Sequence, residues 1–140
     1  MLRAPDMEDS KEKMQDLDSK LKKKILIIDD NEDITELMSV QLTNVGYDTT
    51  VVNDGQMGLE MIKSDAFNII ILDLAMPGFS GLDVIDSLEK TGHAKLYKII
   101  VSTASEISTV ELTNLMKKGV SRWIRKPINF DMLFGILRNL

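Results

Sequence analysis

Polar side chains that could bind a metal ion and a phosphoryl group follow four separate apolar runs of this chain. They are the acidic pair Asp29-Asp30, the carboxylate of Asp73, the hydroxyl of Thr103 and the ammonium group of Lys126, which precedes Pro127. Oxygen ligands suit Mg²⁺, which proteins hold with one or two carboxylates together with phosphate oxygens. An Asp can also be a covalent acceptor that forms an aspartyl phosphate, and Lys126 and Thr103 could bind phosphoryl oxygens. These residue types therefore suit an acceptor site for a phosphoryl group.

The apolar runs that precede these residues predict buried strands. They span residues 25–28, 69–72 and 99–101, with a weaker run at 123–124. Short, continuously apolar runs bounded by polar turns are typical of parallel strands covered on both faces. Ligands of such sheets bind outside the carboxyl ends of the strands. We therefore expect the polar groups to converge on one crevice.

Helical patterns alternate with these strands. Asn31 can cap a first helix whose predicted apolar face includes Leu37 and Val45, and Gly46 ends it. Residues 47–52 predict a further strand, polar enough to be an edge. Five strands alternating with five helices predict an α/β fold, a doubly wound (βα)5 three-layer sandwich, because right-handed crossovers place helices on both faces.

Composition excludes several classes of protein. The chain has 140 residues, enough for one domain, and no cysteine, so disulfides and thiolate metal sites are excluded. The net charge is −5, and residues 25–140 hold sixteen acids against ten bases, which disfavours direct binding of nucleic acid. The sequence holds neither the apolar stretch of a membrane span nor that of a secretory signal. A cytoplasmic protein without membrane insertion is expected.

Residues 1–23 differ from the rest of the chain. They are charged and contain little to bury, which predicts a disordered or weakly helical extension. A dimerising helix is the alternative, because Met7, Met14, Leu17 and Leu21 have heptad-compatible spacing. Residues 24–140 form the predicted domain. No output domain is expected to follow it, although a fragment of a longer protein would give the same sequence.

From Lys24 to Leu140 the chain resembles the receiver domain of bacterial two-component response regulators, in the single-domain arrangement of chemotaxis proteins. The resemblance rests on four blocks in matching order and spacing, which are ILIIDDNEDI, IIILDLAMPGFSGLDVI, IIVSTAS and GVSRWIRKPI. It implies a flavodoxin-like sheet with strand order 2-1-3-4-5. Periodicity alone predicts the α/β class but not that order.

The resemblance also implies roles for individual residues. Asp73 is the expected phosphoacceptor, and Mg²⁺ is held by Asp29, Asp30, Asp73 and the backbone carbonyl of Ala75. Lys126 is the expected catalytic lysine, with a cis bond to Pro127.

Other expected roles concern switching and access. Thr103 is the expected switch hydroxyl, and the small Ala104 leaves room for the phosphoryl group. Trp123 stands where the family usually has Tyr or Phe as the switch aromatic; Trp is larger, and an inward rotamer is harder to reach. Met76, Pro77 and Gly81 match the usual loop after the acceptor.

The function implied is phosphorelay signal transduction. A sensor histidine kinase or phosphotransfer protein would supply the phosphoryl group, and the chain would catalyse only its own phosphorylation and dephosphorylation. Charge added at Asp73 would draw Thr103 and Lys126 inward, repack Trp123 and change a docking surface for a partner protein. The sequence does not identify the kinase, the target, the oligomeric state or the lifetime of the phosphate.

Two other functions compete with this one. A haloacid-dehalogenase-like phosphohydrolase also uses a strand-end Asp with Mg²⁺, but its Asp-x-Asp motif is missing here because Leu74-Ala75 follow Asp73. A receiver-like docking module that is never phosphorylated is the second alternative. Such a module has no need of the full set of acceptor residues.

Overall fold

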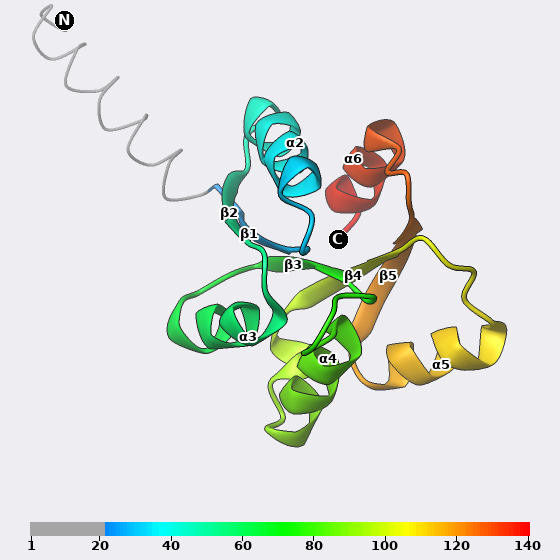
Figure 1. The fold of residues 1–140 in the computed structure, drawn as a ribbon. Coiled ribbons are helices and arrows are strands. Elements are labelled where there is room, and N and C mark those ends of the chain that lie inside the picture. The colour runs from blue at the N-terminus through cyan, green and yellow to red at the C-terminus, as the bar shows by residue number, and fades with distance from the viewer. Residues whose placement is uncertain (1–21) are drawn as a thin grey trace, which may run out of the picture.

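The computed structural model describes residues 22–140, so the predicted extension at residues 1–23 lies almost entirely outside the described part. Five parallel strands form one sheet in the order β2-β1-β3-β4-β5, which confirms the expected topology (Figure 1). The strands are β1 (Lys24–Ile28), β2 (Asp48–Val52), β3 (Ile69–Asp73), β4 (Lys98–Thr103) and β5 (Val120–Arg125). The helices are α2 (Glu32–Asn44), α3 (Gly55–Ser64), α4 (Gly81–Lys90), α5 (Thr109–Lys117) and α6 (Phe130–Arg138), with a 3-10 turn η1 (Ala94–Leu96).

Helices cover both faces of the sheet, as Figure 1 shows, with α2 and α6 on one side and α3, α4 and α5 on the other. Each side has its own hydrophobic cluster, because alternate residues of a strand point to opposite faces. Ile25 and Ile27 belong to the cluster under α2 and α6, whereas Leu26 and Ile28 belong to the other. The apolar residues of β1, β3 and β4 are buried, as expected for the centre of a doubly wound sheet.

Local sequence signals set where the helices begin and end. The side chains of Asn31 and Asn129 accept hydrogen bonds from backbone N–H groups in the first turns of α2 and α6. Ser80 and Asp83 form a capping box at the start of α4. Gly46 follows α2 with a φ of 101°, a backbone conformation that favours glycine. All these helices begin at the edge of the sheet where the strands end.

Some details of the sequence prediction are wrong. Leu37 and Val45 were expected on the buried face of the first helix, but they are 51% and 49% exposed. The second strand begins at Asp48 rather than at residue 47, and η1 was not predicted. Within residues 22–140, no helix combines the length and apolar character needed to cross a membrane.

Candidate functional site

Three carboxylates meet at the carboxyl edge of the sheet. Asp29 follows β1 and Asp73 ends β3, and these strands pair in parallel with Ile28 opposite Leu72. Asp29, Asp30 and Asp73 each place a carboxylate oxygen within 4.8 Å of the others. Asp29 and Asp73 are buried, while Asp30 is exposed. The predicted convergence of these three residues is thus present in the structure.

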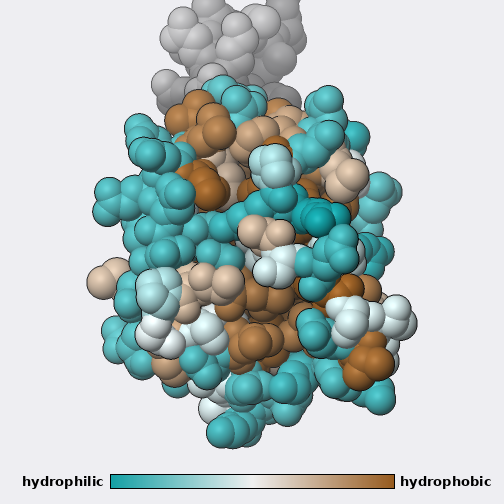
Figure 2. Space-filling model, turned by 45° about the vertical axis from the view of Figure 1, so that its right-hand side comes forward, coloured by the Kyte–Doolittle hydropathy of each residue, from teal (hydrophilic) through white to brown (hydrophobic). Residues whose placement is uncertain are grey.

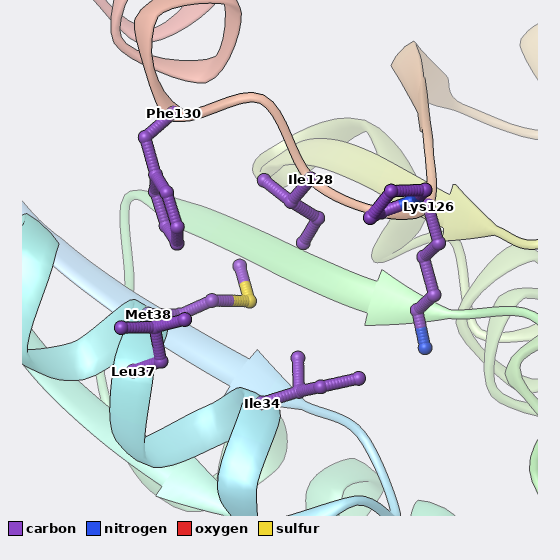
Figure 3. A pocket seen from close by; sticks show the side chains of 7 residues that line it. Ile34, Leu37, Met38, Lys126, Ile128 and Phe130 are labelled. Atoms are coloured by element: carbon purple, nitrogen blue, oxygen red, sulfur yellow. The ribbon is translucent and has the colours of Figure 1, made fainter.

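Lys126 lies between the two buried carboxylates. Its Nζ is 2.7 Å from Oδ2 of Asp29 and 3.3 Å from Oδ2 of Asp73. Figure 3 shows this side chain extending from the loop after β5 toward the ends of the central strands. The peptide bond from Lys126 to Pro127 is cis, as expected. A single ammonium group therefore partly neutralises two carboxylates at the place where a phosphoryl group would add charge.

The remaining oxygens of these carboxylates accept hydrogen bonds from the backbone. The N–H of Asn31 donates to Oδ1 of Asp29 at 3.0 Å, and the N–H of Ala75 donates to Oδ1 of Asp73 at 3.1 Å. Such bonds fix the direction of each carboxylate, because the donors belong to the backbone of the loops that follow β1 and β3.

The site perturbs the protonation of Asp73 and Lys126. Burial raises the pKa of Asp73 and the charge of Asp29 raises it further, outweighing the opposing effects of the Ala75 N–H and of Lys126. Burial lowers the pKa of Lys126, but its hydrogen bond to Asp29 and the charges of Asp29 and Asp73 outweigh burial, so this pKa is raised. Burial, with the neighbouring charge of Asp29, thus disfavours the ionised form of Asp73, and a bound cation would favour that form.

The raised pKa of Asp73 predicts how stability depends on pH without a divalent cation. Ionisation of Asp73 is less favourable in the folded than in the unfolded state, so it lowers the unfolding free energy. This loss is absent below the ordinary pKa of 3.8 and grows as the pH rises from there through the raised pKa of the folded state. In EDTA, the gain in unfolding free energy from Asp73→Asn should therefore increase over this range and then level off. Urea unfolding at a series of pH values measures it. Asp48→Asn, which alters an exposed carboxylate at the start of β2, is the matched control. An equal trend there would contradict the assignment to Asp73.

The other predicted residues lie around this cluster. Thr103 is buried and follows Ser102, the residue of β4 that pairs with Asp73. Its backbone carbonyl accepts from the N–H of Lys126 at 2.8 Å, and its Oγ1 accepts from the N–H of Ser105 at 3.1 Å. Within the described residues no acceptor for the hydroxyl hydrogen of Thr103 is found, and its role as the switch hydroxyl stays a prediction.

Ala104, Ala75 and Trp123 occupy more open positions. Ala104 and Ala75 are exposed. Trp123 is partly buried on the edge strand β5, opposite Val101, and packs against the hydrophobic cluster on the side of α3, α4 and α5. The roles of these three residues in phosphate access, metal binding and switching stay predictions.

Sequence reasoning missed an apolar groove beside Lys126 and a side-chain amide near the acidic pair. The groove encloses about 180 Å³ between α2 and the loop before α6 (Figure 3). It is lined by Ile34, Leu37, Met38, Lys126, Pro127, Ile128 and Phe130. The amide is that of Asn53, which follows β2 at the same edge of the sheet. Its place after a strand was the one available signal.

The donor set fits Mg²⁺. It consists of carboxylate oxygens, which this hard cation prefers, and it leaves one side open for waters and a phosphate oxygen because Asp30 is exposed. A bound cation would also offset the repulsion between Asp29 and Asp73. Within the described residues, the arrangement can therefore hold a cation next to a carboxylate nucleophile, with a lysine and a hydroxyl close by.

Known proteins resemble this chain over most of its length. Residues 25–138 match the response regulator receiver domain. The uncharacterized transcriptional regulatory protein YkoG of Bacillus subtilis is 30% identical over 114 residues, which cover 81% of this chain and 49% of YkoG. The DNA-binding response regulator MtrA of Mycobacterium tuberculosis is 28% identical over 84% of this chain and 50% of MtrA. The chain spans about half the length of the curated relatives it matches.

Solved structures give the same result. The response regulator TrrA of Thermotoga maritima, in complex with Mg²⁺–BeF, has a TM-score of 0.70 and 31% identity, covering 84% of this chain and 97% of that one. The chemotaxis protein CheY4 of Vibrio cholerae has a TM-score of 0.76 and 26% identity, covering 84% and 98%. None of these similarities supports a phosphohydrolase or an unphosphorylated docking module.

Proposed function

Because this chain belongs to the family of response regulator receiver domains, we propose that it accepts a phosphoryl group from a histidine kinase on Asp73. Receiver domains are phosphoacceptor domains of signalling proteins rather than classical enzymes, and they bind Mg²⁺ at an acidic pocket. The observation that carries the proposal is the position of Lys126 Nζ, within 3.3 Å of carboxylate oxygens of both Asp29 and Asp73. Lys126 is only partly buried, so its ammonium group can bind a phosphoryl oxygen on Asp73 as well as the two carboxylates.

In this proposal Asp29, Asp30, Asp73 and the backbone carbonyl of Ala75 hold Mg²⁺. The ion, when bound, would supply positive charge to the phosphoryl oxygens. The three carboxylates are close enough to share one ion, and the loop that carries Ala75 is tied to Asp73 by its N–H. The similarity to TrrA, which was solved with Mg²⁺–BeF, supports this assignment.

The transfer itself needs positioning more than proton chemistry. A carboxylate oxygen of Asp73 forms a bond to phosphorus while the bond from phosphorus to the leaving group breaks, and the electron pair departs with that group. The leaving group is the kinase histidine or, with a small donor, acetate. Lys126 is already beside Oδ2 of Asp73 and can follow the charge onto a phosphoryl oxygen. The open position of Ala104 leaves space for the incoming group. The chain thereby promotes its own phosphorylation and, with water as acceptor, its dephosphorylation.

The signal would leave through the surface of α5, β5 and α6. The hydroxyl of Thr103 would bind a phosphoryl oxygen, and Trp123 would repack as the loop after β4 moves inward. Val110 and Met116 of α5 are 71% and 53% exposed, so this surface already presents apolar side chains. Figure 2 shows hydrophobic residues gathered in the lower half of one face, the half that holds α3, α4 and α5 in Figure 1. A change in the surface of α5, β5 and α6 would alter the binding of a downstream protein.

The wider context follows from family membership. Receiver domains interact with histidine kinases and downstream effectors, and we propose that residues 24–140 act as this unit in the cytoplasm. A sensor kinase or a phosphotransfer protein would be the donor and another protein the target, without direct contact to nucleic acid. The extension at residues 1–23 stays a prediction.

Incubation with acetyl phosphate tests the proposal. With Mg²⁺, intact mass should show the gain of one phosphoryl group, and with EDTA it should show none. Hydroxylamine should remove the group, because it cleaves acyl phosphates and leaves phosphate esters of Ser and Thr intact. Absence of a mass gain with Mg²⁺, or a gain that survives hydroxylamine, would contradict an aspartyl phosphate. Steady release of phosphate from a phosphate ester would instead support the phosphohydrolase.

A further inference from the structure

Residues at the end of β2 form hydrogen bonds with both the backbone N–H and the backbone carbonyl of Asp29. The N–H of Asp29 donates to the carbonyl of Val52 at 3.2 Å, and the carbonyl of Asp29 accepts from Nδ2 of Asn53 at 2.9 Å. The first bond continues the pairing of β1 with β2. The second is different in kind, because it comes from a side chain that reaches back from beyond the strand.

The amide of Asn53 is itself fixed by α2. Its Nδ2 also donates to Oγ1 of Thr35 at 3.0 Å, and Thr35 Oγ1 donates to the carbonyl of Glu32 at 3.1 Å. Thr35 is 2% exposed. Because a backbone carbonyl can only accept, the nitrogen of the Asn53 amide must face Asp29. Because the hydroxyl hydrogen of Thr35 is used by Glu32, its oxygen is left to accept from Asn53.

We propose that Asn53, braced by Thr35, is a positioning residue for the acidic pair Asp29-Asp30. The inference rests on the proposed function and deepens it. The carbonyl of Asp29 and the N–H of Asp30 belong to one peptide group, so a bond that fixes this group fixes the direction in which the two side chains diverge. Residues that orient metal ligands change metal affinity without touching the ion.

The need for such a brace follows from the charges of the site. Asp29, Asp30 and Asp73 each place a carboxylate oxygen within 4.8 Å of the others, and like charges at such distances repel each other. An unbraced Asp29-Asp30 turn would relax by moving these oxygens apart. Asn53 and Thr35 hold the turn from two other elements, so the pocket keeps its shape before a cation enters.

Asn53→Ala removes both bonds and should weaken Mg²⁺ binding by about tenfold, the lower end of the range for residues that orient metal ligands. Calorimetric titration of the unphosphorylated full chain with Mg²⁺ measures the dissociation constant. The matched control is Asn68→Ala, which removes an amide that bonds to the backbone of Lys24 at the opposite edge of the sheet. An unchanged constant in Asn53→Ala, or an equal loss in Asn68→Ala, would overturn the proposal.

Thr35 offers a second pair of variants that nearly keep its volume. Thr35→Val removes the hydroxyl and should weaken Mg²⁺ binding, whereas Thr35→Ser keeps the hydroxyl and should keep the affinity near that of the unmodified chain. Equal affinities of the Val and Ser variants would argue against the brace even if Asn53→Ala folded poorly.

Phosphorylation by acetyl phosphate gives a second readout. In Asn53→Ala the Mg²⁺ concentration at half-maximal rate should rise about tenfold, while the rate at saturating Mg²⁺ returns to near that of the unmodified chain. A loss that saturating Mg²⁺ does not recover would contradict a role through the acidic pair. If the unmodified chain took up no phosphate, the proposed function would fail, while a loss of Mg²⁺ affinity in Asn53→Ala would still support the positioning role.

Discussion

Asp73→Asn is expected to abolish phosphoryl uptake from acetyl phosphate, lowering the rate at least about a hundredfold, because loss of a covalent nucleophile costs more than this in well-studied enzymes. The amide has nearly the shape of the carboxylate but is not a nucleophile. Intact mass after incubation with acetyl phosphate and Mg²⁺ measures the effect. Fluorescence of Trp123, the single tryptophan of the sequence, provides a second signal. Any change that phosphorylation causes in this fluorescence should be absent from the variant.

The fold of this variant should remain intact. The substitution removes the charge of one of the two buried carboxylates that repel each other, and Lys126 would keep its 2.7 Å contact to Asp29. Equal urea unfolding midpoints, or a higher one for the variant, would show that lost uptake reflects lost chemistry. Asp48→Asn is again the matched substitution and should take up phosphate normally. Uptake by Asp73→Asn at the rate of the unmodified chain would move the acceptor to another residue.

Gly81→Ala should cost about 2–3 kcal/mol of unfolding free energy, near the upper end of the range for overpacking. Gly81 begins α4 directly behind the acceptor, and a Cβ at this position would collide with the backbone carbonyl of Asp73 and lie 2.8 Å from Cα of Leu74. Backbone atoms of a buried strand end cannot move aside as a flexible side chain could. Urea unfolding measures the loss of stability. The collision should also displace Asp73, and this displacement should slow phosphorylation even under conditions where the variant is folded.

Gly135→Ala is the control for this substitution. Gly135 lies inside α6, where an added Cβ meets nothing closer than the Arg138 guanidinium at 4.0 Å. Alanine there should raise the unfolding free energy by about 0.5–1 kcal/mol, because it lowers the conformational entropy of the unfolded chain. A variant at Gly81 as stable as the one at Gly135 would contradict the close approach of α4 to β3.

The acidic cluster could be predicted from two rules about parallel sheets together with the family resemblance. Apolar runs mark the strands, and parallel strands bring their carboxyl ends to one edge. Asp29, Asp30 and Asp73 are then neighbours if β1 and β3 are adjacent. That adjacency came from the family resemblance, since alternation of helices and strands does not determine the order of strands in a sheet.

Side-chain contacts were harder to predict. Helical spacing placed Leu37 on the inner face of α2, but it says nothing of how far the opposite loop lies, and Leu37 lines a groove with Ile128 instead of being buried. The role of Asn53 was missed for a related reason. Whether an Asn after a strand faces solvent or a backbone carbonyl depends on the neighbouring helix, here through Thr35.

The attachment of α5 sets how easily this domain can change shape. Leu115 is the buried residue of this helix, and burying one leucine side chain contributes about 1.5–3 kcal/mol. If detaching α5 cost no more than this, the detached arrangement would be populated at least about 1% of the time at room temperature. Phosphorylation would then not need to create a new conformation. It would increase the population of a conformation that already exists. Each 1.4 kcal/mol by which phosphorylation favours the detached conformation would raise its ratio to the attached one about tenfold.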